Sequence, residues 1–284
     1  MRHIIKLASI VLLGGGLGAC AYRGLEVEGK ECSASHPCPD DLACVASDAL
    51  GTYVCAACTD AVCSSVPPTG YLVHRAATVP DLADTTLSDF AAAATITLTV
   101  TETGTTGTYR LLWDDTALYV AASVQDDDLA SIIATRDGDL WGDDSIELEL
   151  DRRALTSDGD AELANVDDYK LFVNLLNAQR DDQGGGYWGN GWDGTWTSHV
   201  TVQGTLGDAV ADTGYVLAMS LPWSAWSNVH DTFTAPLAGD IWGLDIVLND
   251  LRGDDSSPSR TWKNTDGGTV NNPGGWGSMT FAQP

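Results

Sequence analysis

The chain has 284 residues, with 40 acidic and 14 basic side chains, and a formal net charge of −26 at pH 7. This charge repels phosphate backbones and anionic lipid headgroups, so it excludes nucleic acid as a partner and membrane binding through the protein surface itself. Tryptophan (10 residues) outnumbers phenylalanine (4), which is unusual for a core and indicates exposed aromatic surfaces.

Residues 1–19 are predicted to be a lipoprotein signal peptide. Arg2 and Lys6 precede an apolar stretch that is too short to span a bilayer well. The ending "LGAC" resembles a bacterial lipobox, which implies that Cys20 carries the lipid and that the chain meets a membrane through this anchor only. We therefore expect an extracytoplasmic lipoprotein of the outer membrane or cell surface. An ordinary cleaved signal with a spare cysteine is the alternative.

A tether, residues 20–31, leads to a predicted disulfide-rich module, residues 32–63. The module holds six cysteines, an even number that is typical of disulfides in an exported chain: Cys32, Cys38, Cys44, Cys55, Cys58 and Cys63. Their pairing stays open. A zinc site would rest on the Cys55-x-x-Cys58 spacing alone, in a compartment that oxidises thiols. The module is read as a spacer, with a binding element as the alternative, and residues 64–70 as a proline-containing linker.

Residues 71–284 are predicted to form an all-β domain, an antiparallel, jelly-roll-like β-sandwich, because short alternating strands recur with turn signals between them. Asp114 and Asp115 split two apolar runs, which predicts a hairpin. Helix signals are confined to 82–94 and 222–226. Three tryptophans lie in apolar strand contexts and are predicted to be in the core: Trp113, Trp223 and Trp242. A monomer is expected.

The stretch 145–151 ("SIELELD") alternates strictly between apolar and acidic residues, which predicts a strand with Glu147 and Glu149 on one face. The same period puts Lys170 with Asn174, and Asp245 with Asn249, on faces of two other strands. Acids, amides and one cation could thus line one concave surface. The alternatives for Glu147 are a solvated strand face and an internal salt bridge with Lys170.

Four segments, in order, resemble carbohydrate-binding module family 9: "LLWDDTALYVAASVQDDDL", "DLWGDDSIELELD", "GYVLAMSLPWSAW" and "IWGLDIVLNDLR" with the following "RTWKN" and "WGSMTF". The resemblance covers roughly residues 79–281. It implies a β-sandwich without catalytic activity that binds an oligo- or polysaccharide between two tryptophans. Each motif is short, and the four in this order make the resemblance specific. The matching positions are Trp141 and Trp262 as platforms, with Glu147, Lys170, Asn249 and Asp250 as polar partners.

The segment 184–196 ("GGGYWGNGWDGTW") departs from the family pattern by being longer and richer in tryptophan. It leaves open whether Trp262 or one of Trp188, Trp192 and Trp196 is the partner of Trp141. We therefore include Trp192 among the candidate ligand-binding residues.

A calcium site is predicted at Asp126, Asp127 and Asp128, because clustered carboxylates at a strand end suit the oxygen preference of calcium. The family resemblance also implies structural calcium. A solvated turn is the alternative, and no organic cofactor is expected.

Two further functions compete with sugar binding. One is a structural or adhesion module that has lost its ligand. The other is a haem-binding electron-transfer domain, for which Met219, Met279 and Lys170 are the available ligands. Scattered histidines and the lack of nucleophile or phosphate-binding motifs argue against an enzyme, although the chain could assist glycoside hydrolases.

Overall fold

The computed structural model describes residues 42–47, 52–57, 70–152, 164, 166–184, 188, 192–208, 210–226, 233–253, 256–263 and 271–282. The strands in these ranges are β1 (Leu42–Ser47), β2 (Thr52–Ala57), β3 (Tyr71–Arg75), β4 (Ile96–Thr99), β5 (Thr106–Trp113), β6 (Ala117–Gln125), β7 (Ser145–Asp151), β8 (Asp168–Asn174), β9 (Gln179–Gln183), β10 (Thr197–Gln203), β11 (Gly214–Pro222), β12 (Ile241–Asn249), β13 (Ser259–Thr261) and β14 (Gly277–Phe281). Four 3₁₀ turns accompany them: η1 (Ser88–Phe90), η2 (Leu140–Gly142), η3 (Trp223–Ala225) and η4 (Pro273–Gly275).

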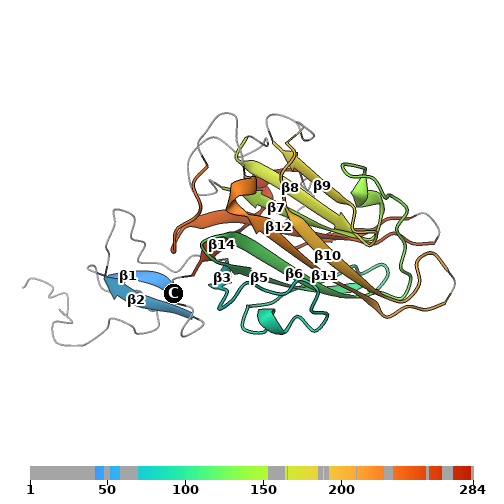
Figure 1. The fold of residues 1–284 in the computed structure, drawn as a ribbon, viewed down its shortest axis with the longest axis horizontal. Helices are drawn as coiled ribbons and strands as arrows, with labels where there is room; N and C mark the ends of the chain where they lie inside the picture. Colours follow the sequence, from blue (N-terminus) through green and yellow to red (C-terminus); the bar gives the residue numbers. More distant parts are fainter. Residues whose placement is uncertain are drawn as a thin grey trace, which may run out of the picture.

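The strands from β3 onward form a sandwich whose two halves are joined at one strand. The order is β10-β11-β6-β5-β3-β14-β12-β7-β8-β9, with β4 beside β5 and β13 beside β12. β3 pairs in parallel with β14 through residues 71–73 and with β5 through residues 74–75, so it passes from one half to the other. The predicted all-β sandwich is confirmed (Figure 1).

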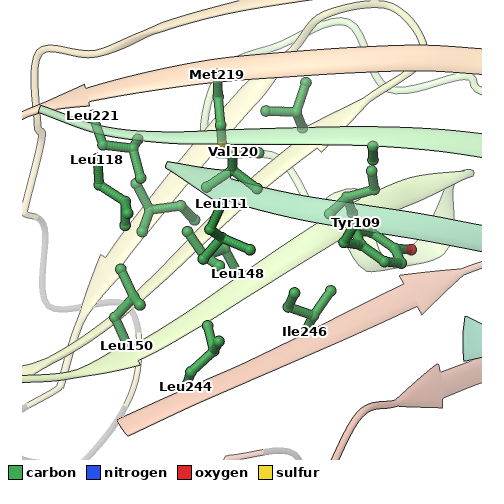
Figure 2. Packing of buried hydrophobic residues seen from close by; sticks show 14 of the residues in the cluster. Tyr109, Leu111, Leu118, Val120, Leu148, Leu150, Met219, Leu221, Leu244 and Ile246 are labelled. Atoms are coloured by element: carbon green, nitrogen blue, oxygen red, sulfur yellow. The ribbon is translucent and has the colours of Figure 1, made fainter. Parts of the chain in front are cut away.

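The core lies between the two halves and is built from alternate residues of each strand. Figure 2 shows Leu111 and Val120 on one side facing Leu148 and Ile246 on the other, and all four side chains are at most 1% exposed. The period-two pattern dictates this arrangement, because every second side chain of a strand points to the same face. The opposite face of β7 is therefore fixed as the one that carries the acids.

Several local predictions are confirmed. β5 and β6 form the hairpin around Asp114 and Asp115. The helix signals at 82–94 and 222–226 correspond to η1 and η3, each a single short turn. The three tryptophans predicted to be in the core are buried, with exposed fractions of 2%, 6% and 4% for Trp113, Trp223 and Trp242.

The geometry does not support the haem alternative. Met219 and Met279 are fully buried in the main core cluster. Lys170 is the register partner of Glu149, on the side of β8 that points away from that core. A haem iron could not reach both kinds of ligand, since they lie on opposite faces of a sheet.

At the N-terminal end the backbone of β1 and β2 forms an antiparallel pair that places Cys44 opposite Cys55. The other cysteines, including Cys20, lie outside the described residues, as do the signal peptide and the linker, so the predicted domain boundaries and disulfides stay predictions. Among the described residues, no helix has the length and apolar character needed to cross a membrane.

Candidate functional site

The side of β12, β7, β8 and β9 that points away from the core carries rows of paired residues, and we call it the polar face. One row runs Val247–Glu147–Phe172–Arg180 across the four strands. The next runs Asp245–Glu149–Lys170–Asp182. Register partners project to the same side of a sheet, so the predicted gathering of acids, amides and a cation is present.

Lys170 joins the two glutamates at the centre of the polar face. Its Nζ lies 2.5 Å from Oε1 of Glu147 and 2.5 Å from Oε1 of Glu149, and the three side chains are at most 4% exposed. Burial alone would lower the pKa of Lys170, but the two carboxylates outweigh it and the pKa is raised. Burial, reinforced by Glu147, raises the pKa of Glu149 well above its usual range. The acidic face is thus an internal salt bridge and not a solvated surface.

Glu147 keeps one carboxylate oxygen available. Lys170 donates to Oε1, and the hydrogen bonds among the described residues include none to Oε2. The ion pair fixes the carboxylate in one orientation, so Oε2 is a pre-positioned acceptor.

Trp141 stands on one side of Glu147, above β8 and β9. Its indole is 45% exposed, the Arg180 guanidinium lies 4.6 Å from its ring centroid, and Phe172 lies 6.2 Å away. Phe172 packs with Leu140 and Ala178, which supports the turn that carries Trp141. Since Phe172 and Arg180 belong to the Glu147 row, Trp141 lies at the same level along the strands as Glu147.

The carboxylate of Asp143 holds the Trp141 turn in place. It accepts hydrogen bonds from the Ser131 hydroxyl (2.8 Å) and from the backbone N–H groups of Ile132 (3.1 Å) and Ile133 (3.0 Å). The Asn174 amide, on the polar face, donates to the same carboxylate at 2.7 Å. The turn that carries Trp141 is therefore hydrogen-bonded, through Asp143 and Asn174, to β8, the strand that also carries Lys170.

Trp262 follows β13, which pairs with β12 on the edge opposite to β7, the strand that carries Glu147. Its backbone N–H donates to the Ile246 carbonyl (3.0 Å) and to the buried Asp245 carboxylate (3.0 Å). Its neighbour Thr261 is the register partner of Val247, the residue beside Glu147 in the row. The ring itself is partly buried against the core cluster, and the Lys263 ammonium lies 4.7 Å from its centroid.

The Trp-rich segment contributes Trp188, which covers the cation. The Lys170 Nζ lies 5.0 Å from the Trp188 ring, and Trp188 stacks on Trp276 at 6.1 Å and 29°. The sequence reasoning did not single out Trp276, although "WGSMTF" was part of the resemblance. Trp192 is instead a core residue, 9% exposed, which stacks on Trp226 and meets Tyr169 edge-on. The structure thus removes Trp192 from the polar face.

Asn249 lies on the polar face one row away from Glu147. It is the register partner of Ser145, donates a 3.1 Å hydrogen bond to the Ser145 hydroxyl, and is 5% exposed. It shares a strand face with Asp245, as the period of the sequence predicts, and its amide is oriented by a neighbour on β7.

A cluster of three buried carboxylates lies at the strand ends next to this row. Asp126 follows β6, Asp144 precedes β7 and Asp250 follows β12, and each offers an oxygen within 4.8 Å of the others. Burial and the neighbouring carboxylates raise the pKa of Asp126 to about 6 and that of Asp144 to about 9. Asp126 Oδ2 and Asp250 Oδ1 are buried and accept no hydrogen bond from the described residues.

This donor set fits calcium, which prefers several carboxylate oxygens, and a dication would offset the charge that burial penalises. It corrects the predicted site. The side chains of Asp127 and Asp128 are 70% and 29% exposed, so they do not converge with the buried Asp126. Arg252 lies within 3.1–3.6 Å of Asp126, Asp127, Asp128 and Asp250. Asp144 and Asp250 take their places.

Residues 82–283 match the family described as carbohydrate family 9 binding domain-like, and the chain belongs to this family of non-catalytic binding domains. No curated protein matches the chain. Among solved structures, a family 9 module from Caldicellulosiruptor kristjanssonii is similar in its glucose complex, with 20% identity, a TM-score of 0.54, and coverage of 75% of this chain and 96% of that one. Its cellotriose complex gives the same identity and TM-score, with 94% of that chain covered.

Proposed function

We propose that the protein binds an oligo- or polysaccharide without cleaving it, with a sugar ring between Trp141 and Trp262 and Glu147 at the floor. The observation that carries the proposal is the row Val247–Glu147–Phe172–Arg180: Trp141 contacts Phe172 and Arg180 at one end, and Thr261, which precedes Trp262, pairs with Val247 at the other. The backbones at Val247 and Phe172 are two strand spacings apart, roughly 10 Å.

The chemistry of the row suits a pyranose. Indole rings cover the apolar C–H faces of a sugar, and a fixed carboxylate oxygen accepts hydrogen bonds from its hydroxyls. Family membership and the glucose and cellotriose complexes of the similar module support a β-glucan as the first ligand to test. The protein would then hold polysaccharide near the cell for glycoside hydrolases displayed beside it.

Burial of the centre of the polar face favours a second candidate, a structural or adhesion module without a sugar ligand. Glu147 and Lys170 are each 3% exposed, and Trp188 lies over the cation. A sugar that reached Lys170 would have to take the place of this indole. In the proposed pose only Glu147 Oε2 and the two platforms meet the ligand, so Trp188 can stay.

Calorimetric titration of the full-length protein with glucose and cellotriose, in calcium, separates these candidates. Trp141→Ala removes a half-exposed platform and is expected to weaken binding by tenfold or more, since stacking on one face is lost. Leu237→Ala, at a 70% exposed residue that no contact links to the polar face, is the matched control. Heat that is equal in both variants, or absent from the folded wild type, would refute the proposed site.

We also propose that Asp126, Asp144 and Asp250 hold a structural calcium ion. The orphaned carboxylate oxygens support it, and the three residues come from both halves of the sandwich, so an ion would join the halves at this edge. Melting with calcium and with a chelator tests the site: the midpoint should rise with calcium in the wild type and stay unchanged in Asp126→Asn.

The proposed location is the outer membrane or cell surface, with the lipid on Cys20 and disulfides in the module 32–63. The support is the sequence of the N-terminus. Labelling with radioactive palmitate should mark the wild type but not Cys20→Ser, and the variant should move to the soluble fraction. A wild type that is unlabelled would show an ordinary cleaved signal instead.

A further inference from the structure

A pocket lies on the half of the sandwich opposite to the polar face. The pocket, of about 280 Å³, opens between residues 85–87 and the outward side of β5 and β6. In Figure 1 the segment around η1 runs below β5 and β6, whereas β8 and β9 lie at the top, so the pocket and the polar face are on different sides of the molecule. The strand residues that line it are Thr106, Thr108, Arg110, Ser123 and Gln125.

These side chains form one polar surface. Thr106 is opposite Gln125 and Thr108 is opposite Ser123 in the β5–β6 register, and Arg110 follows on the same face of β5. Together they provide hydroxyls, an amide and a guanidinium, which can donate to and accept from a polar ligand in several directions.

The pocket is unusual in its charge. None of its lining residues is acidic, in a chain with 40 acidic residues. Arg110 forms no ion pair with any described residue, and its Nε–H is buried without a hydrogen-bond acceptor. Five other arginines do pair with aspartates: Arg75, Arg136, Arg152, Arg180 and Arg252. A buried donor without an acceptor is costly, so an incoming acceptor would be favoured here.

The rim of the pocket is already in place. The Asp84 carboxylate accepts hydrogen bonds from the backbone and hydroxyl of Thr86 (2.8 and 2.7 Å) and of Ser88 (2.9 and 2.6 Å). Leu87 is 4% exposed and packs with Phe90 beneath the loop. A ligand would not have to order this segment, which lowers the cost of binding.

We propose that this pocket binds the carboxylate-bearing ring of an acidic sugar, a hexuronate, as a second site independent of the polar face. A guanidinium is the side chain best suited to a carboxylate, and the threonine, serine and glutamine groups suit the ring hydroxyls. The pocket is smaller than those that take drug-sized ligands, so it fits one ring. No aromatic platform lines it, and the charge of Arg110 therefore sets the preference.

The test follows the arginine Nε–H resonances of the ¹⁵N-labelled full-length protein by NMR while glucuronate or galacturonate is added. The Arg110 signal, identified by its loss in Arg110→Lys, should shift with a Kd of roughly millimolar, as expected of a single ring. Glucose, which lacks the carboxylate, and acetate, which lacks the sugar ring and its hydroxyls, should each bind at least several-fold more weakly.

Two variants and one control complete the test. Arg110→Gln should weaken hexuronate binding about tenfold or more, because a charge-assisted hydrogen bond is lost. Thr108→Val, which keeps the shape, should weaken it by a smaller factor. Glu147→Gln should leave it unchanged even if it abolishes binding at the polar face. Binding that survives Arg110→Gln, that is lost in Glu147→Gln, or that acetate matches would overturn the proposal.

Discussion

Replacement of Lys170 by methionine would test how the buried charges of the polar face are balanced. Methionine keeps most of the volume but removes the ammonium that lies 2.5 Å from both Glu147 and Glu149. Two adjacent carboxylates, 4% and 0% exposed, would then lack their cation. Removing one partner of a buried ion pair costs about 3–5 kcal/mol, because the remaining charge is buried without compensation.

For a domain of about 200 residues, each kcal/mol lowers the midpoint by about 2–4 °C, so Lys170→Met should melt roughly 6–20 °C below the wild type at neutral pH. The loss should depend on pH. The pKa of Glu149 is already raised in the folded state, and without Lys170 it rises further. A folded pKa above the unfolded value of about 4.3 means that stability is present at low pH and is lost as the pH rises through the folded pKa.

The assay is thermal or urea unfolding of the wild type and Lys170→Met at several pH values between about 4 and 8, the range that spans an ordinary glutamate pKa and neutrality. The exposed Lys263→Met is the matched control and should change stability by less than about 1 kcal/mol. The double variant Lys170→Met with Glu147→Gln should recover part of the loss. A gap below about 1 kcal/mol, or one that is independent of pH, would refute the reasoning.

Three further outcomes are expected. Without calcium, stability should fall as the pH rises from about 4 to about 9, because the folded pKa values of Asp126 (about 6) and Asp144 (about 9) exceed the ordinary value of about 3.9, and calcium should remove this fall in calorimetric scans. Asp143→Ala should weaken sugar binding without contacting the sugar, since it frees the turn that carries Trp141; unchanged titrations would count against this role. Trp192→Ala should cost about 3–5 kcal/mol in urea unfolding, as a core residue, and a loss of sugar affinity at unchanged stability would contradict its placement.

The period of the sequence predicted which residues share a face but not what covers that face. Glu147, Glu149 and Lys170 were placed together correctly, because alternation along a strand fixes side-chain direction. Their burial could not be predicted, because the covering groups come from distant segments. The rings of Trp188 and Trp276 stack on each other although the two residues are 88 positions apart in the sequence, and no local pattern links them.

The residues of the carboxylate cluster also could not be predicted from the sequence alone. Adjacent residues Asp126, Asp127 and Asp128 look like a metal site in the sequence, but they lie in a bend after β6 in which only Asp126 is buried. The cluster is assembled by strand pairing: Ser145 and Asn249 are register partners, so the residues next to them, Asp144 and Asp250, come together at one strand end. That pairing is tertiary information.

The burial of the ion pair bears on how a sugar would be bound. Lys170 holds one oxygen of Glu147 in place, and the hydrogen bonds among the described residues include none to Oε2. An acceptor fixed by a neighbour loses little conformational entropy on binding, unlike an exposed glutamate with free rotamers. The lysine can therefore support recognition without touching the ligand. If so, the affinity lost in Lys170→Met should be regained in part at the low pH at which the domain regains stability, whereas the loss in Trp141→Ala should not depend on pH.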